Sequence, residues 1–177
     1  MQNPERLLTT LLLLLASSFT QALQDDWQQE MIIQSNSAEL DRKSGMVVYE
    51  GKVQLTQGTL KIEADRLVLM FEGKHLQQAI ANGNPANYEQ KVSKDKPVTR
   101  ASAERIDYFA TSREVAFTGN AELRQDSNLF SGEVIRYNIN TETVTARGAE
   151  STTPGKQEEP KQRIRVVIQP DDAGPAE

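Results

Sequence analysis

The stretch VAFTGNAEL, residues 115–123, places its larger apolar side chains at odd-numbered positions, with Gly119 at the centre of the same set. Successive side chains of a β-strand point to opposite faces, so this pattern predicts a strand with one buried face. A glycine on the apolar face removes a packing side chain, which is typical of a bend, a bulge or a close approach.

The same arrangement recurs along the chain. It is complete in VVYEGKVQL (47–55), around Gly51, and less complete in AIANGNPANY (79–88), around Gly83, and VTARGAE (144–150), around Gly148. The spacing between these glycines varies, which predicts a repeated structural unit whose loops differ in length.

A second segment accompanies each glycine strand and changes its apolar parity midway. In residues 60–71 the apolar positions are even before Asp65 and odd after it, and similar switches occur near Glu104 and Glu133. A strand whose core-facing set changes parity turns a corner or carries a bulge. The three carboxylates could solvate these corners or act as catalytic acids. Their repetition favours the first interpretation, because an enzyme needs one asymmetric constellation.

Turn signals rich in Gly, Asn and Asp separate many short strand-like segments, and no segment reads as a long helix. This density of strands is typical of an all-β sandwich, roll or barrel. We expect a last strand within residues 163–170, a flexible loop at 149–162 and a disordered tail at 171–177.

The N-terminus predicts a secretory signal peptide at residues 1–22, with Arg6 before a leucine-rich run at 7–16 and small residues at Thr20 and Ala22. The run is shorter than the roughly 20 residues that span a bilayer. Cleavage after Ala22 would leave a domain at 23–170. The chain has no cysteine, so we expect no lipid attachment and no disulfide, as in a bacterial periplasmic protein.

The composition offers little for catalysis. Hydrophobic residues make up 37% and aromatic residues 6%, which predicts one domain with an aliphatic core, and a formal net charge of -5 disfavours nucleic acid as a partner. The one histidine, His75, lies in a charged turn. We therefore predict no enzyme, no metal site and no cofactor. A periplasmic hydrolase of cell wall or glycans, and a purely structural filament module, remain as alternatives.

Three stretches, read together, carry a family likeness: VVYEGKVQLTQGTLKIEADRLVL (47–69), GNPANYEQ (83–90) and VAFTGNAELRQDSN (115–128). They resemble the OstA-like repeats of the periplasmic lipopolysaccharide-transport proteins typified by LptA. The resemblance covers roughly residues 31–169. It implies a twisted antiparallel β-jellyroll, open along a hydrophobic groove that holds the acyl chains of lipopolysaccharide. We expect Gly51, Gly83, Gly119 and Gly148 to stack along the interior of the sheet, where they let the strands bend and keep room for lipid.

The resemblance also implies partners. Proteins of this family stack head to tail with one another, with LptC at the inner membrane and with the N-terminal domain of LptD at the outer membrane, and so form a bridge. We expect EMIIQS (30–35) and RIRVVIQP (163–170) to be edge strands, because an uncovered edge is a template for strand addition. By position, Met31 and Ile33 match the N-terminal edge residues that the family uses towards LptC, so the resemblance implies that they face a partner. We expect Val166 and Ile168 to face a partner at the other edge.

The predicted groove residues share an apolar or aromatic side chain on the inward face of a repeat strand. They are Tyr49, Val53, Leu55, Ile62, Leu67, Leu69, Phe71, Tyr88, Ile106, Tyr108, Phe117, Leu123, Ile135 and Tyr137.

Overall fold

The computed structural model describes residues 26–91, 96–148 and 163–168. The predicted signal peptide, the loop at 149–162 and the tail at 171–177 lie outside the described residues. The described elements are η1 (Asp26–Gln28), β1 (Met31–Gln34), β2 (Ser37–Asp41), β3 (Met46–Gln57), β4 (Leu60–Glu72), β5 (His75–Gln90), β6 (Thr99–Phe109), β7 (Glu114–Gln125), β8 (Asn128–Asn138), β9 (Thr143–Arg147) and β10 (Arg165–Val167). Among them, no helix is long and apolar enough to cross a bilayer.

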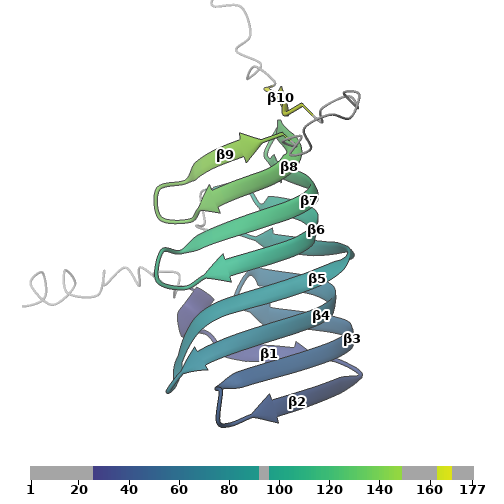
Figure 1. Ribbon diagram of the computed structural model, residues 1–177. Helices are drawn as coiled ribbons and strands as arrows, with labels where there is room; N and C mark the ends of the chain where they lie inside the picture. The colour runs from purple at the N-terminus through teal and green to yellow at the C-terminus, as the bar shows by residue number, and fades with distance from the viewer. Residues whose placement is uncertain (1–25, 92–95, 149–162, 169–177) are drawn as a thin grey trace, which may run out of the picture.

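All ten strands form one antiparallel sheet, in the order β1-β3-β4-β5-β6-β7-β8-β10, with β2 also paired to β3 and β9 to β8. Strands β3 to β8 are long and bend midway, so each contributes to two layers (Figure 1). We call the layer that contains β1 and β10 the β1 wall. Between these two edge strands, it contains one half of each of the strands β3 to β8: residues 53–57, 60–64, 86–90, 99–103, 121–125 and 128–132. The layer that contains β2 and β9 is the β2 wall.

The bends lie where the sequence predicts them. The pairing register shifts between Glu63 and Arg66 on β4, between Ser102 and Arg105 on β6, and on β7–β8 opposite Glu133. These positions are the parity switches, and the side chains of Asp65 and Glu104 there are exposed. The prediction of a corner in each repeat unit is therefore confirmed.

Two of the repeated glycines let the strands bend, as expected, but do not face the interior. Gly51 and Gly119 have φ values of +81° and +82°, in the left-handed region that favours glycine. A Cβ on Gly119 would lie 2.7 Å from the exposed Glu104 carboxylate on the neighbouring strand. The idea that these glycines keep room for lipid was wrong, because they permit the bend and clear a surface side chain.

The other two glycines also lie outside the apolar core. Gly83 belongs to the bulge of β5, where an added Cβ would lie 2.7 Å from the backbone nitrogen of Ala86. Gly148 follows the end of β9 at Arg147.

The sheet has edge strands at both ends, as expected. Among the described strands, β1 and β2 each pair with β3 at one end, and β9 and β10 each pair with β8 at the other. The roles of β2 and β9 were not recognised from the sequence. Each end thus presents one edge strand from each wall.

Candidate functional site

The inward faces of the two walls form one hydrophobic cluster that contains every predicted groove residue. Tyr49, Phe71 and Tyr108 are partly buried at its margin. The buried members of the predicted set are Val53, Leu55, Ile62, Leu67, Leu69, Tyr88, Ile106, Phe117, Leu123, Ile135 and Tyr137. The structure thus brings all of them together, while their role towards a ligand stays a prediction.

The two walls touch in the middle of this cluster. The ring of Tyr88, from the β1 wall, meets the ring of Phe117, from the β2 wall, edge to face with 5.5 Å between centroids. Both side chains are almost completely buried. The interior is therefore narrower here than the open groove that the resemblance implies, because the rings of Tyr88 and Phe117 fill the space between the walls at this level.

A cavity of 60 Å³ lies beside this contact. Leu55 and Ile62 from the β1 wall and Leu69, Ala79 and Val115 from the β2 wall contribute to its apolar lining. Ligand pockets usually have volumes of roughly 300–1,000 Å³. The cavity is therefore a small opening between the walls that a long acyl chain would have to widen.

Polar residues of the cavity lie at the side opposite the corners, where the strand-connecting turns of the two walls face each other. We call this side the mouth. Figure 1 shows η1 there, on the side of the turns that join β6 to β7 and β8 to β9. The charged and amide side chains at the mouth that also line the cavity are those of Asp26, Gln57, Gln90 and Arg113.

Asp26 holds η1 at the mouth. Its Oδ1 accepts a hydrogen bond from the backbone N–H of Thr59 at 2.7 Å, and its Oδ2 accepts from the Thr59 hydroxyl and the Gln90 amide, each at 2.7 Å. Gln90 in turn accepts a hydrogen bond from the buried Tyr88 hydroxyl at 2.5 Å. No periodic pattern in the sequence predicts this network, because its members come from three separated segments.

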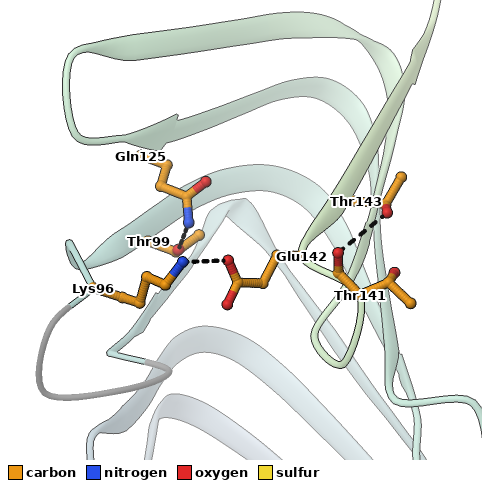
Figure 2. Close-up of polar contacts among 6 residues, drawn as sticks. All are labelled: Lys96, Thr99, Gln125, Thr141, Glu142 and Thr143. Carbon is orange, nitrogen blue, oxygen red and sulfur yellow. Dashed lines mark hydrogen bonds and ion pairs between the residues drawn. The ribbon is translucent and has the colours of Figure 1, made fainter. Parts of the chain in front are cut away.

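Further along the mouth, polar contacts lie both between the two walls and within the β1 wall (Figure 2). Lys96, just before β6, forms an ion pair at 2.9 Å with Glu142, in the turn between β8 and β9. Gln125 donates a hydrogen bond to the Thr99 hydroxyl at 3.3 Å. Both charged side chains are about half exposed, so the pair contributes little to stability.

Three tyrosines belong to the apolar interior: Tyr88 and Tyr137 are buried, and Tyr108 is partly buried against the core. Burial raises the pKa of Tyr88, Tyr108 and Tyr137 above the usual 10.0, since a phenolate would lose its hydration there. Nearby negative charge adds to this effect at Tyr88. All three therefore stay protonated at neutral pH and can donate hydrogen bonds.

The inward apolar faces continue beyond the walls at both ends. Leu40 on β2 pairs with Val47 and is 56% exposed, and Val166 on β10 pairs with Phe130 and is 44% exposed. Ile168 is 72% exposed and lies just past the end of β10 at Val167. Met31 and Ile33 are partly buried against the core. The apolar interior is thus uncovered where the sheet stops.

This geometry defines a class: a two-walled antiparallel β-jellyroll with an apolar interior, a polar mouth along one side and uncovered ends. The family described as LptA/(LptD N-terminal domain) LPS transport protein matches residues 32–143. The chain belongs to this family.

Individual relatives agree. The chain is 38% identical over 157 residues to the lipopolysaccharide export system protein LptH of Pseudomonas aeruginosa, over 88% of each chain. It is 32% identical over 136 residues to the lipopolysaccharide export system protein LptA of Escherichia coli K12, over 76% of this chain and 73% of that one.

A solved structure shows the same fold. The crystal structure of LptH, the LptA homologous periplasmic component of the lipopolysaccharide transport device of P. aeruginosa, matches with a TM-score of 0.72 at 37% identity. The match covers 83% of this chain and all of the solved one. The prediction of an OstA-like β-jellyroll is therefore confirmed.

Proposed function

We propose that this protein is a periplasmic carrier that holds the acyl chains of lipopolysaccharide between its two walls and passes the lipid from the inner to the outer membrane. The observation that carries the proposal is the apolar interior, which reaches both ends of the sheet and is uncovered there. The family membership and the names of the relatives support the choice of lipid.

Burial of the acyl chains supplies the affinity. Each buried methylene contributes about 0.8 kcal/mol, so roughly ten of them give about 8 kcal/mol before the costs of association and of separating the walls. The cavity beside Tyr88 offers a place where separation can begin, because part of the space there is already free of side chains. No charged site is required for binding of this strength.

The same proposal includes assembly in a row. The β1 and β2 edges of one copy would meet the β10 and β9 edges of the next, so that the apolar faces join across the junction. LptC at the inner membrane and the N-terminal domain of LptD at the outer membrane would take the terminal positions. The uncovered side chains of Leu40 and Val166 support this arrangement.

The two alternatives have less support. A hydrolase would need carboxylates gathered in a cleft, whereas Asp65 and Glu104 are exposed on successive corners of the sheet. A purely structural filament module would not need an apolar interior that is uncovered at its ends. We therefore infer a binding protein rather than an enzyme.

Site-specific photo-crosslinking tests the proposal. A photoreactive residue placed at Leu69, Tyr108 or Phe117 should yield lipopolysaccharide adducts in cells, because these side chains belong to the interior cluster. The control is Glu122, which is exposed. Adducts at Glu122 as strong as those at the interior positions, or none at any position, would contradict the proposal.

A further inference from the structure

The cavity between the walls is apolar except at the mouth. Apolar side chains such as Leu69, Leu76 and Ile106 line it from inside, and Arg113, Tyr108 and Ile139 line it from the β2-wall side of the mouth. An amphiphile that enters this cavity must place its tail among the apolar side chains inside and its polar head at the mouth, beside Arg113 and Tyr108.

The structure fixes the position of Arg113. This residue ends the turn between β6 and β7, and its backbone carbonyl accepts a hydrogen bond from the N–H of Ile139 at 3.0 Å. Its guanidinium donates to the side-chain oxygen of Asn140 at 3.4 Å. Two turns of the β2 wall thus meet at Arg113 and hold it beside the cavity.

Tyr108 lines the same cavity as Arg113. Burial raises the pKa of Tyr108, whereas the positive charge of Arg113 acts in the opposite direction. The phenol is partly buried against the core and lines the cavity. A protonated hydroxyl and a guanidinium can both donate hydrogen bonds to one anion.

Two carboxylates of this region affect where an anion can lie. Glu114, next to Arg113 in the chain, forms an ion pair with Arg136 at 2.5 Å. Asp26, at the β1-wall side of the mouth, accepts hydrogen bonds from Thr59 and Gln90. The negative charge of Asp26 would repel an anion, so the β2-wall side, where Arg113 lines the cavity, suits an anion better.

We propose that Arg113 and Tyr108 form a subsite for the phosphate of a lipid headgroup, which orients the lipid with its head at the mouth and its acyl chains between the walls. The guanidinium fork matches the geometry of phosphate oxygens and keeps its charge at any physiological pH. The partly buried position strengthens the interaction relative to one in open water. This inference rests on the proposed function and adds the headgroup chemistry to it.

Binding to lipopolysaccharide with and without its phosphate groups tests the subsite. Arg113→Gln should weaken binding of the phosphorylated lipid about tenfold and leave binding of the dephosphorylated lipid unchanged. Arg113→Lys should recover part of the affinity, and Tyr108→Phe should show a smaller loss in the same direction. Thermal unfolding of each variant, measured without lipid, confirms that the fold is retained.

Arg124→Gln is the matched control, because it removes the same charge from an exposed position outside the cavity. It should change neither affinity more than twofold. Equal losses for both lipids in Arg113→Gln, or equal effects of Arg113→Gln and Arg124→Gln, would overturn the subsite. Failure of the unaltered protein to bind either lipid would instead overturn the proposed function.

Inorganic phosphate is the second probe, because it carries the same chemistry without acyl chains. A headgroup subsite predicts that inorganic phosphate raises the unfolding temperature of the unaltered protein slightly more than that of Arg113→Gln, and much less than the lipid does. If it instead protects the unaltered protein as strongly as the lipid does, the site serves free phosphate and the proposal is wrong.

Discussion

Tyr88 and Phe117 join the two walls by an edge-to-face contact, with an angle of 73° between their ring planes. Such pairs contribute about 0.5–1.5 kcal/mol beyond the burial of their area. The double variant of Tyr88→Leu and Phe117→Leu should therefore be less destabilised than the sum of the two single variants, by about that amount. Chemical denaturation of the four proteins measures this coupling.

A distant pair provides the control for this cycle. Tyr49 on β3 and Tyr137 on β8 lie in the same wall but are separated by four strands in the sheet order. Their leucine variants should be additive within about 0.5 kcal/mol. Equal coupling in both pairs would show that the effect is not a direct contact between the rings.

The Asp26 network should stabilise the protein by holding η1 on the sheet. Asp26→Ala leaves donors of Thr59 and Gln90 without their acceptor in a partly buried site, so we expect a loss of roughly 2 kcal/mol. Thermal unfolding measures it. Glu63→Ala, at an exposed position of β4, should change stability by less than about 0.5 kcal/mol. A similar small effect for Asp26→Ala would mean that the network adds nothing to stability.

Alanine variants of Gly73 and Gly119 distinguish the cost of backbone strain from the cost of steric overlap in the unfolding free energy. Gly119 and Gly73 both have positive φ, but a Cβ would lie 2.7 Å from Glu104 at Gly119 and near nothing at Gly73. Gly73→Ala should therefore cost about 1 kcal/mol from strain alone, and Gly119→Ala clearly more. Unfolding free energies of both variants measure the difference.

The partner of Gly119 offers a further check. Truncation of Glu104 to Ala in the Gly119→Ala background should recover part of the extra cost, since carboxylate atoms of Glu104 cause the overlap. Equal losses at Gly73 and Gly119, with no recovery, would show that the close approach of Glu104 is unimportant.

The repeats and the corners could be predicted from the sequence because they leave a local pattern. A period of two identifies each strand, and the parity switch at Asp65 or Glu104 reports that the strand turns. The inward set follows directly, so the predicted groove residues all fall in the interior cluster.

The space between the walls could not be predicted in the same way. It depends on how far apart the walls settle, and contacts such as Tyr88 with Phe117 join positions far apart in the sequence. The close approach of Gly119 to Glu104 likewise depends on a positive φ at Gly119. The alternation of apolar residues along the strand does not reveal this backbone angle. Asp26 carries no periodic signal, so its contacts with Thr59 and Gln90 emerge only from the folded chain.

The buried tyrosines predict a loss of stability at high pH. Because burial raises the folded pKa of Tyr88 above the usual 10.0, folding keeps a proton that the unfolded chain releases. The stabilising effect is complete below about pH 10 and is lost as the pH rises further. Above that pH, the unfolding free energy should fall by about 1.4 kcal/mol per pH unit for this residue.

Tyr88→Phe isolates the contribution of this hydroxyl. Denaturant titrations at several pH values above about 10 should give a slope that is smaller by about one proton than in the unaltered protein. An unchanged slope would mean that the Tyr88 hydroxyl ionises as readily in the folded protein as in the unfolded chain.

The uncovered end at β10 predicts a concentration-dependent association that depends on apolar contact. Val166→Asp places a charge on the inward face at the edge of the sheet, where the next copy would cover it, and an unpaired buried charge opposes association strongly. Sedimentation velocity over a range of concentrations should show the variant as monomer where the unaltered protein forms larger species.

Thr145→Asp on β9 is the control for this variant, since Thr145 is exposed and pairs with Arg136, which is also exposed. It introduces the same charge on β9, the other edge strand at this end of the sheet, but away from the apolar face, so it should leave association nearly intact. If both variants dissociate the protein equally, net charge governs association; if neither does, the apolar face at β10 takes no part in the junction.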